Sequence, residues 1–514
     1  MEWGDAYMCY LLGYDIGSSS IKATLIEAAT GKVITTVISP KTEFKIIAHY
    51  PGWAEQDPQV WWDNVKAATS KISLHSRVNP ADIEAIGLSY QMHGLVMVDK
   101  DQRILRPSII WCDSRAVEIG EKAFSSIGKE TCLKRLLNSP GNFTASKLKW
   151  VMLNEPEVYT KIHKAMLPGD YIAMMMTGEI KTTPSGLSEG IMWDFQNNEL
   201  ANLILDYYGI SPDIIPEIVP TFSIQGELTK KAADELGLKK GTKISYRAGD
   251  QPNNAFSLNV LNPGELATTA GRSGIIYGVI DKINYDPKSR VNTVVHVNHT
   301  KEHPRYGILL CINGSGILYS WLKHNLTSLG IAEMSYKQMD KLASQVPAGS
   351  EGLVILPYGN GAERTLENRN IGASVYGLNF NSHHRSHFLR AAHEGIVFAI
   401  NYGLEIMQDL GITATTVRAG NANMFSSSLF GEVFATVTGA NVEIYNTDGS
   451  QGSARGAGLG AGIYKTPQDA FAGLKAERVI EPNKKLKVIY QDAYNRWVSI
   501  LKNLLSKEQK NERK

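Results

Sequence analysis

The sequence has few cysteines and no pattern that would join them. Only four of the 514 residues are cysteine, namely Cys9, Cys112, Cys132 and Cys311, and no two form a C-x-x-C pair. Such spacing is typical of reduced cysteines and argues against a disulfide framework or a zinc site. The first residues contain acids and no basic stretch, unlike a secretory signal. We therefore expect a cytoplasmic protein.

Long hydrophobic runs and an excess of charge of one sign are also lacking. No uncharged apolar run approaches the ~18 residues that a membrane-spanning helix needs. The chain has 53 basic and 51 acidic residues, a net charge of +2, which gives no reason to expect binding to nucleic acid or to a membrane surface. With 514 residues the chain exceeds the ~250–300 that one core accommodates, so two large domains are expected.

The order of the predicted elements is typical of an α/β fold. A strand, a loop and a strand occupy residues 11–27, in the stretch LLGYDIGSSSIKATLIE. Asp57 and Pro58 are favourable residues for the start of a helix. Two β-rich runs between 82 and 99 are interrupted at Gln91–Gly94.

The same plan returns in the second half of the chain. Residues 243–261 predict a strand, a Gly-Asp turn and a helix, and residues 264–280 repeat the strand, glycine-containing loop and strand of 11–27. Two later segments, 415–439 and 449–464, place glycine-rich turns at the starts of predicted helices. Backbone N–H groups at such positions can bind anions.

Four stretches, taken in order, resemble the FGGY carbohydrate kinases. They are GYDIGSSSIK at 13–22, YQMHG at 90–94 with LRPSIIWCDSR at 105–115, AGDQPNN at 248–254, and LPYGNGAERT at 356–365. The resemblance covers about residues 10–500, and QMHG resembles the xylulose kinases of this family better than the glycerol kinases, which carry an Arg-Glu pair there.

The resemblance implies two ribonuclease-H-like domains of the actin and hexokinase type, with sugar and ATP in the cleft between them. Residues 9–257 would form the N-terminal domain, with the sugar site, the first phosphate hairpin and the catalytic aspartate. Residues 258–505 would form the C-terminal domain, with the second phosphate hairpin and the adenosine site. The family also suggests a homodimer.

The loop after the first strand has two interpretations. From local pattern alone it is a plain hairpin in which Gly17 takes a positive φ and the serines solvate the turn. By resemblance it is the first phosphate hairpin, in which Gly17, Ser18 and Ser19 offer N–H and hydroxyl donors to an anion. Asp15 would then face the metal and phosphates, and Mg²⁺ favours carboxylates, often through its waters.

Asp250 also has two interpretations. The sequence GDQP is a good helix start, so Asp250 could cap free N–H groups. By resemblance it is the catalytic base that accepts the proton of the sugar hydroxyl. An aspartate with an ordinary pKa near ~3.9 is ionised at neutral pH and ready for that role.

Met92 and His93 correspond to the sugar-contacting pair of the family. A histidine can donate from one ring nitrogen and accept at the other, which suits a polyol, although a buried core histidine is an equal alternative. Gly94 would let the sugar approach the backbone. For Trp111, Asp113 and Arg115 a structural ion pair is at least as good an explanation as support of the sugar site.

Two segments depart from the family pattern. The second phosphate hairpin usually reads Gly-Thr-Ser-Gly, but here Gly271 and Ser273 flank Arg272. The adenosine loop usually has three glycines in a row, but here it reads AGNANMF, in which Gly420 and Asn421 can still approach a nucleotide. These differences leave the purine preference open.

Together these features predict an ATP-dependent, Mg²⁺-requiring ketopentose kinase that converts D-xylulose to its 5-phosphate. One alternative is a kinase of the same family for another keto sugar or polyol, such as ribulose. Another is a nucleotide- and sugar-binding clamp on the same fold that binds without transfer. The retained Asp250 argues against the clamp, because a binding module has no need of a base.

Overall fold

The N-terminal half of the chain forms a mixed sheet around strand β1. The computed structural model describes residues 8–326 and 334–512. The sheet is 6-stranded, with strand order β13-β14-β5-β1-β2-β3. Its strands are β1 (Tyr10–Ile16), β2 (Ile21–Glu27), β3 (Val33–Ser39), β5 (Ile83–Tyr90), β13 (Phe222–Glu227) and β14 (Lys243–Gly249). Strand β1 pairs antiparallel with β2 and parallel with β5, and β14 continues the parallel part.

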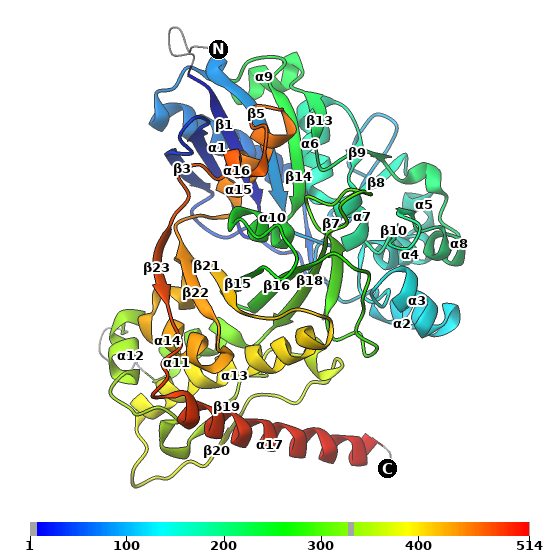
Figure 1. Ribbon diagram of the computed structural model, residues 1–514. Helices are drawn as coiled ribbons and strands as arrows, with labels where there is room; N and C mark the ends of the chain where they lie inside the picture. The colour runs from blue at the N-terminus through cyan, green and yellow to red at the C-terminus, as the bar shows by residue number, and fades with distance from the viewer. Residues whose placement is uncertain (1–7, 327–333, 513–514) are drawn as a thin grey trace.

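The C-terminal half repeats this arrangement around strand β15. Its sheet is 7-stranded, with strand order β17-β18-β16-β15-β21-β22-β23. The strands are β15 (Leu266–Ala270), β16 (Gly274–Ile280), β17 (Asn292–Val295), β18 (Tyr306–Ile312), β21 (Thr416–Gly420), β22 (Asn441–Tyr445) and β23 (Ala476–Ile480). Strand β15 pairs antiparallel with β16 and parallel with β21. The α/β fold with two sheet-containing halves is therefore confirmed (Figure 1), as is the repeat of 11–27 at 264–280.

Two helices cross between the halves. Helix α10 (Asp250–Ser257) follows β14 of the N-terminal sheet, yet its Ala255 packs in one cluster with Ala267 and Tyr277 of the C-terminal sheet. Helix α15 (Gly449–Gly460) follows β22 of the C-terminal sheet, yet its Ala454 packs with Leu11 of β1. Figure 1 shows α10 between the two sheets and α15 against the N-terminal sheet.

Helix α15 lies unusually close to the N-terminal sheet. A Cβ atom added to Gly13 would lie 2.0 Å from the carbonyl oxygen of Ser450, and one added to Gly87 would lie 2.0 Å from that of Ser453. Side chains at these positions would push the helix off the sheet. The sequence predicts a glycine-rich turn before a helix at 449–464. That prediction is wrong, because the glycines between 449 and 460 lie within α15 itself and allow its close packing on the sheet.

Some of the other helices pack on the sheets, and α2, α3, α4, α5 and α8 form a group to one side of the N-terminal sheet (Figure 1). Asp57 caps α1 by accepting a hydrogen bond from the backbone N–H of Gln59, as expected, and Pro58 is the first helical residue. The α-helices not yet bounded are α1 (Pro58–Ser76), α2 (Val117–Ile127), α3 (Lys129–Arg135), α4 (Thr144–Asn154), α5 (Pro156–Tyr159), α6 (Pro168–Thr177), α7 (Pro184–Glu189), α8 (Asn202–Tyr208), α9 (Lys230–Leu236), α11 (Ser315–Leu326), α12 (Tyr336–Ala343), α13 (Arg385–Asp409), α14 (Ser428–Thr438), α16 (Pro467–Ala470) and α17 (Lys487–Glu512).

Short strands outside the two large sheets pair with one another two by two. They are β4 (Glu55–Gln56), β6 (Val96–Val98), β7 (Ser108–Ile109), β8 (Lys164–Met166), β9 (Lys181–Thr182), β10 (Trp193–Asp194), β11 (Glu199–Leu200), β12 (Glu217–Ile218), β19 (Val354–Leu356) and β20 (Ser374–Tyr376). The interruption expected at Gln91–Gly94 is confirmed, since β5 ends at Tyr90 and β6 begins at Val96.

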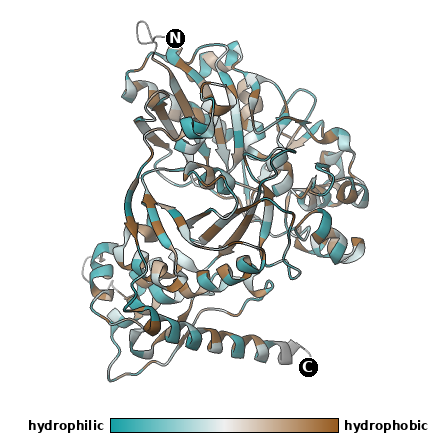
Figure 2. Cartoon of the chain, viewed as in Figure 1, coloured by the Kyte–Doolittle hydropathy of each residue, from teal (hydrophilic) through white to brown (hydrophobic). Residues whose placement is uncertain are grey.

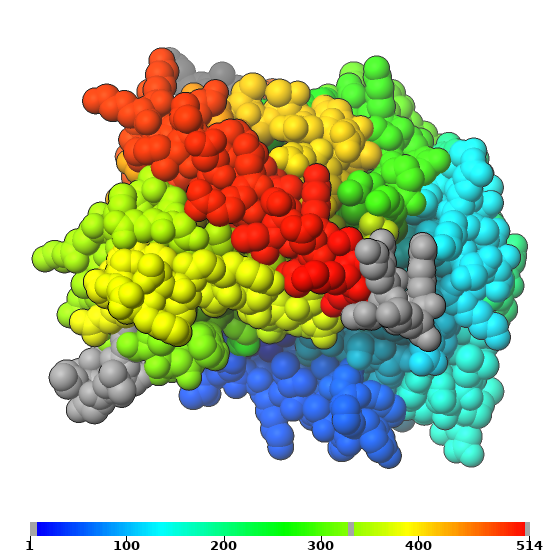
Figure 3. Space-filling view, turned by 90° about the horizontal axis from the view of Figure 1, so that it is seen from below, coloured from blue at the N-terminus to red at the C-terminus, as the bar shows by residue number. Residues whose placement is uncertain are grey.

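The core lies on the sheets and under the long C-terminal helices. Figure 2 shows hydrophobic residues on the central strands, many of which are fully buried. Helix α17 lies across the lower face over α13 (Figure 3), where Trp497 packs on Phe398 with ring centroids 6.3 Å apart. All four cysteines are free, as predicted. Within residues 8–326 and 334–512, every helix is too short or too polar to cross a membrane.

Candidate active site

The ends of strands β1 and β14 bring together two acidic side chains, Asp15 and Asp250. Asp15 is the penultimate residue of β1, and its Oδ1 accepts a hydrogen bond of 2.9 Å from the hydroxyl of Ser89 on β5. Burial raises the pKa of Asp15, and nearby Lys22 partly offsets that effect. A Cβ added to Gly449 would lie 2.7 Å from Asp15 Oδ2, so the carboxylate lies directly against the start of α15.

Asp250 is the first residue of α10, and Gly249 takes the N-cap position without a side-chain capping bond. Asp250 is therefore not the N-cap residue itself, although its carboxylate accepts a hydrogen bond from the backbone N–H of Gln251 in the first turn. Burial, followed by the charge of Asp15, raises the pKa of Asp250 to about 7. The expectation of an ordinary aspartate pKa is also wrong, because local sequence does not reveal that Asp15 and Asp250 meet. A carboxylate with a pKa near neutrality is a better proton acceptor than an ordinary aspartate.

His93 lies in the loop after β5 and is held as a neutral imidazole. Its Nδ1 donates to the backbone carbonyl of Glu189 at 2.9 Å, and its ring lies edge-on to Phe143 with centroids 4.7 Å apart. Burial, followed by the charge of Lys147, lowers the pKa of His93 to about 3. With the proton on Nδ1, the lone pair of Nε2 can accept a hydrogen bond.

The neighbours of His93 differ in their surroundings. Met92 is buried and packs in one cluster with Ala255 and Leu258, so it links the loop to α10. A Cβ added to Gly94 would lie 2.5 Å from Cγ of Pro168. Close packing against Pro168 therefore explains why residue 94 is a glycine. The approach of a sugar to Gly94 stays a prediction.

Glu189 is a site residue that the sequence analysis missed. It ends α7, is only 2% exposed, and its Oε2 accepts from the backbone N–H of His93 at 3.2 Å. Burial raises the pKa of Glu189 well above its usual range, and the charge of Asp250 adds to the increase. No local motif marks Glu189, because it meets His93 only through the tertiary fold.

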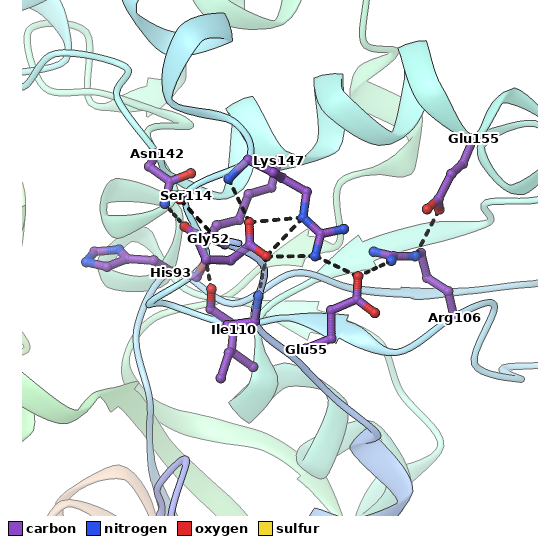
Figure 4. A network of polar contacts seen from close by, with 12 residues as sticks. Gly52, Glu55, His93, Arg106, Ile110, Ser114, Asn142, Lys147 and Glu155 are labelled. Atoms are coloured by element: carbon purple, nitrogen blue, oxygen red, sulfur yellow. Dashed lines mark hydrogen bonds and ion pairs between the residues drawn. The ribbon is translucent and has the colours of Figure 1, made fainter. Parts of the chain in front are cut away.

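A network of ion pairs supports the loops beside this site (Figure 4). Arg115 forks onto Asp113, with Nη2 2.7 Å from Oδ2, and also lies 2.7 Å from Glu55. Arg106 forms ion pairs with both Glu55 and Glu155. The structural explanation of Asp113 and Arg115 is therefore confirmed. Trp111, by contrast, extends to the first hairpin.

The first hairpin, between β1 and β2, is closed by the backbone. The N–H of Gly17 donates to the carbonyl of Ser20 at 3.1 Å. Gly17 is not among the described glycines with a positive φ, so that expectation is wrong. The indole N–H of Trp111 donates to the Ser18 hydroxyl at 3.2 Å, and the carbonyl of Ser19 accepts from the N–H of Phe44.

The second hairpin, between β15 and β16, lies on the start of α11. The backbone N–H groups of Gly316 and Ile317 donate to the carbonyls of Gly271 and Arg272. The Ser273 hydroxyl lies beside Cys311 and lowers the pKa of its thiol, although burial raises that pKa overall to about 12.

A cavity of about 530 Å³ opens beside the second hairpin. Its wall includes Gly271 and Arg272 from the hairpin, Tyr319 from α11, Asp340 from α12, and Asn423. His393, fully buried, lies 3.0 Å from Asp340, and Tyr319 donates to the same carboxylate at 2.9 Å. Aromatic rings, a carboxylate and an arginine around one cavity suit a charged, planar ligand.

The predicted adenosine-loop residues lie next to this cavity and are not among its lining residues. Gly420 ends β21, and the side-chain amide of Asn421 donates to Glu477 at 2.8 Å. Asn423, two residues further on, takes φ 55° and lines the cavity instead. The role of Gly420 and Asn421 in nucleotide binding stays a prediction. The sequence did not indicate Asn423, because the turn after β21 decides which side chain faces the cavity.

Within the described residues, no three His, Cys, Asp or Glu side chains are arranged to hold a metal ion by themselves. Asp15 nevertheless fits a metal that is shared with phosphates. Its carboxylate lies near the carboxylates of Asp250 and Asp448, and Asp448 is 3.3 Å from Lys22. Mg²⁺ uses such an oxygen-only site when one or two carboxylates and substrate phosphates supply its ligands.

Comparison with known proteins identifies the class. Residues 10–257 match the N-terminal domain of the FGGY family of carbohydrate kinases, and residues 274–463 match its C-terminal domain. The chain therefore belongs to the FGGY family of carbohydrate kinases and is a sugar phosphotransferase, which implies ATP as phosphoryl donor. The alternative of a clamp that binds without transfer is not supported.

Several proteins similar to this chain are named xylulose kinases. The chain is 29% identical over 475 residues to a xylulose kinase of Bacillus subtilis, covering 90% of each chain. It resembles the crystal structure of a "xyloylose kinase" from Brucella ovis, with a TM-score of 0.87 and 25% identity over 97% of this chain and 99% of that one. It also resembles a xylulose kinase from Rhodospirillum rubrum, with a TM-score of 0.85 and 25% identity over 96% and 99%. The two-domain actin- and hexokinase-type fold is thereby confirmed.

Proposed function

We propose that this kinase transfers the γ-phosphoryl group of ATP to the 5-hydroxyl of D-xylulose, with Asp250 as general base. The observation that carries the proposal is the meeting of Asp250 with Asp15 at the ends of β14 and β1, where burial and Asp15 raise the pKa of Asp250 to about 7. The xylulose kinases similar to this chain support the choice of sugar.

Asp250 would accept the proton of the sugar hydroxyl while its oxygen attacks the γ-phosphorus. The bond from that phosphorus to the β–γ bridging oxygen breaks, and ADP leaves. Because phosphoryl transfer demands little covalent work of the protein, alignment and charge neutralisation supply the rest. A base with a pKa near the working pH is ionised in part of the molecules and still accepts a proton well.

The two hairpins would hold the phosphates from opposite halves of the chain. Gly17, Ser18 and Ser19 offer small side chains and backbone N–H groups on one side. On the other side, Gly271 is followed by Arg272, whose guanidinium has no ion-pair partner among the described residues. We place the nucleoside in the cavity of about 530 Å³ that adjoins Arg272.

Asp15 would hold Mg²⁺, through a water molecule, together with the phosphates of ATP. The ion, when bound, neutralises phosphate charge during transfer. The positive charge also favours the ionised form of Asp250, which lies beside Asp15.

His93 would bind the sugar through Nε2, which accepts a hydrogen bond from a hydroxyl group, while Met92 and Gly94 form the adjoining wall. A neutral imidazole suits an uncharged polyol, because it adds polarity without a charge that must be desolvated.

A panel of sugars tests the proposal. Release of ADP is measured with D-xylulose, ribulose, glycerol and gluconate at equal concentrations. We expect the highest kcat/KM with D-xylulose. If ribulose or another acceptor exceeds D-xylulose, the sugar assignment is wrong while the kinase class stands.

A further inference from the structure

His93 has an unusual backbone conformation for a residue with a side chain. Its φ is 60°, in the left-handed region that is unfavourable for residues other than glycine. Such a conformation persists only where the surrounding structure enforces it. The contacts that do so come from Glu189 and Lys147, residues outside the QMHG motif.

Glu189 holds the amino side and the ring of His93. Its Oε2 accepts from the His93 backbone N–H at 3.2 Å, and its own backbone carbonyl accepts from His93 Nδ1 at 2.9 Å. The second bond fixes the tautomer, because a carbonyl can only accept. One residue at the end of α7 therefore sets both the backbone and the ring orientation.

Lys147 of α4 holds the carboxyl side of the same residue. Its Nζ donates to the carbonyl of His93 at 2.8 Å and to that of Ile110 at 2.9 Å. The side chain is fully buried. Figure 4 shows Lys147 next to His93 and Ile110. Burial lowers the pKa of Lys147 to about 7, and its amino group can donate to the two carbonyls with or without the extra proton. A buried lysine that bonds backbone carbonyls is a costly feature, which indicates a specific task.

Glu189 also connects His93 to the end of strand β14, which directly precedes Asp250. A Cβ added to Gly249 would lie 3.1 Å from Oε2 of Glu189, so the carboxyl lies against the residue before Asp250. Glu189 therefore lies between the imidazole and the start of α10.

We propose that Glu189 and Lys147 are positioning residues for phosphoryl transfer, which together hold His93 in its left-handed conformation and present Nε2 to a sugar hydroxyl at a fixed place relative to Asp250. The inference rests on the proposed function, because it assumes that His93 binds the sugar. It assigns to this kinase two specificity-determining residues that do not touch the substrate.

Three variants and a matched control test the inference. Glu189→Ala removes the acceptor for the His93 N–H, and Lys147→Met removes the donor to its carbonyl. Glu189→Gln keeps an acceptor oxygen without the ionisable group. Lys149→Met is the control, because Lys149 lies on the same helix and also donates to a carbonyl, that of Tyr208, at 2.7 Å.

We expect Glu189→Ala and Lys147→Met each to raise the KM for D-xylulose by about 10-fold, as loss of a buried hydrogen-bond partner does, with the KM for ATP within about 2-fold of wild type. Glu189→Gln should recover most of the sugar affinity, and Lys149→Met should leave both constants near wild type. If Glu189→Gln is as damaging as Glu189→Ala, the hydrogen bond that Glu189 accepts from the His93 N–H does not account for its effect, and the positioning role is wrong.

Double variants separate this inference from the proposed function. Glu189→Ala and Lys147→Met should each add nothing to the loss caused by His93→Ala, because all three act through one imidazole. If the losses add, or if either single variant changes only the KM for ATP, the inference is overturned. If His93→Ala itself leaves the KM for D-xylulose unchanged, the sugar site of the proposed function is wrong instead. Should Glu189→Ala fail to fold by thermal melting, Lys147→Met and its double variant decide the outcome.

Discussion

Asp15 in the N-terminal half and Thr269 in the C-terminal half occupy corresponding positions, one residue before the end of β1 and of β15. Both strands lead into a hairpin and pair with a parallel strand on the other side. Only the N-terminal half places a carboxylate there, with a second one, Asp250, at the end of β14. Equivalent frameworks therefore carry different chemistry, and in our proposal the N-terminal half supplies the metal ligand and the base.

The hairpins differ in the same way. The N-terminal one carries serines after its glycine, whereas the C-terminal one carries Arg272 and adjoins the cavity of about 530 Å³. In the proposed function, neutral hydroxyl and N–H donors contact the phosphates from one half and a positively charged guanidinium contacts them from the other. The triphosphate would thus receive hydrogen bonds from both halves and a balancing charge from Arg272.

The crossing helices differ in how they pack. Helix α15 touches the N-terminal sheet backbone to backbone at Gly13, whereas α10 touches the C-terminal sheet through side chains that include Ala267. Gly13 and Ala267 lie three residues before the ends of β1 and β15. The N-terminal contact therefore tolerates less change than the C-terminal one.

The largest expected effect is on catalysis. Asp250→Asn keeps the shape of the side chain and removes its ability to accept a proton. We expect kcat with D-xylulose to fall by about 10²-fold or more, while the sugar still binds. Steady-state kinetics and isothermal titration calorimetry measure the two parts. Near-normal turnover by the folded variant would exclude Asp250 as base.

The next largest effect concerns the packing of α15. Gly13→Ala places a Cβ 2.0 Å from the carbonyl oxygen of Ser450, and we expect a loss of about 3 kcal/mol in the free energy of unfolding. The matched change in the other half, Ala267→Gly, should cost only about 1 kcal/mol. Denaturant unfolding measures both, and equal losses would contradict the difference between the crossing helices.

His93→Ala is expected to weaken the binding of sugar by about 1–3 kcal/mol, because it removes one buried hydrogen-bonding group. Binding of a non-hydrolysable ATP analogue should be unchanged. Isothermal titration with D-xylulose and with the analogue tests this. Unchanged sugar affinity would return His93 to the alternative of a core residue.

The smallest effect is expected at Arg272. Arg272→Ala should raise the KM for ATP several-fold at low salt, where phosphate contacts are least screened, and leave the KM for D-xylulose unaltered. The variant is assayed with each substrate varied in turn. Identical constants for variant and wild type would show that Arg272 is a solvated surface residue.

Much of the framework could be predicted from local sequence. The strand pairs at 11–27 and 264–280 follow from alternating apolar runs around glycine loops, and the start of α1 follows from Asp57 and Pro58. These features depend on neighbours in the chain. The division at residue 258, the homodimer and the cytoplasmic location stay predictions.

The contacts that tune the site could not be predicted in this way. Glu189 meets a residue 96 positions away, and the pKa of Asp250 depends on burial beside Asp15. Gly17 lacks the positive φ expected of it, whereas His93 has one. The QMHG motif gives no sign of this backbone conformation at His93. A helix from the C-terminal half lying on the N-terminal sheet likewise leaves no local signal beyond glycines at 13 and 87.

The central claim is that Asp250 is the base and that Asp15 tunes it. The most direct measurement is the pH dependence of kcat/KM for D-xylulose in wild type, Asp15→Asn and the matched control Thr269→Ala. In wild type we expect kcat/KM to rise with pH through an inflection near the Asp250 pKa of about 7, since the base acts only when ionised. Removing the negative charge of Asp15 should move that inflection to lower pH, whereas Thr269→Ala should not move it. An inflection that is missing in wild type, or that stays in place in Asp15→Asn, would contradict the account.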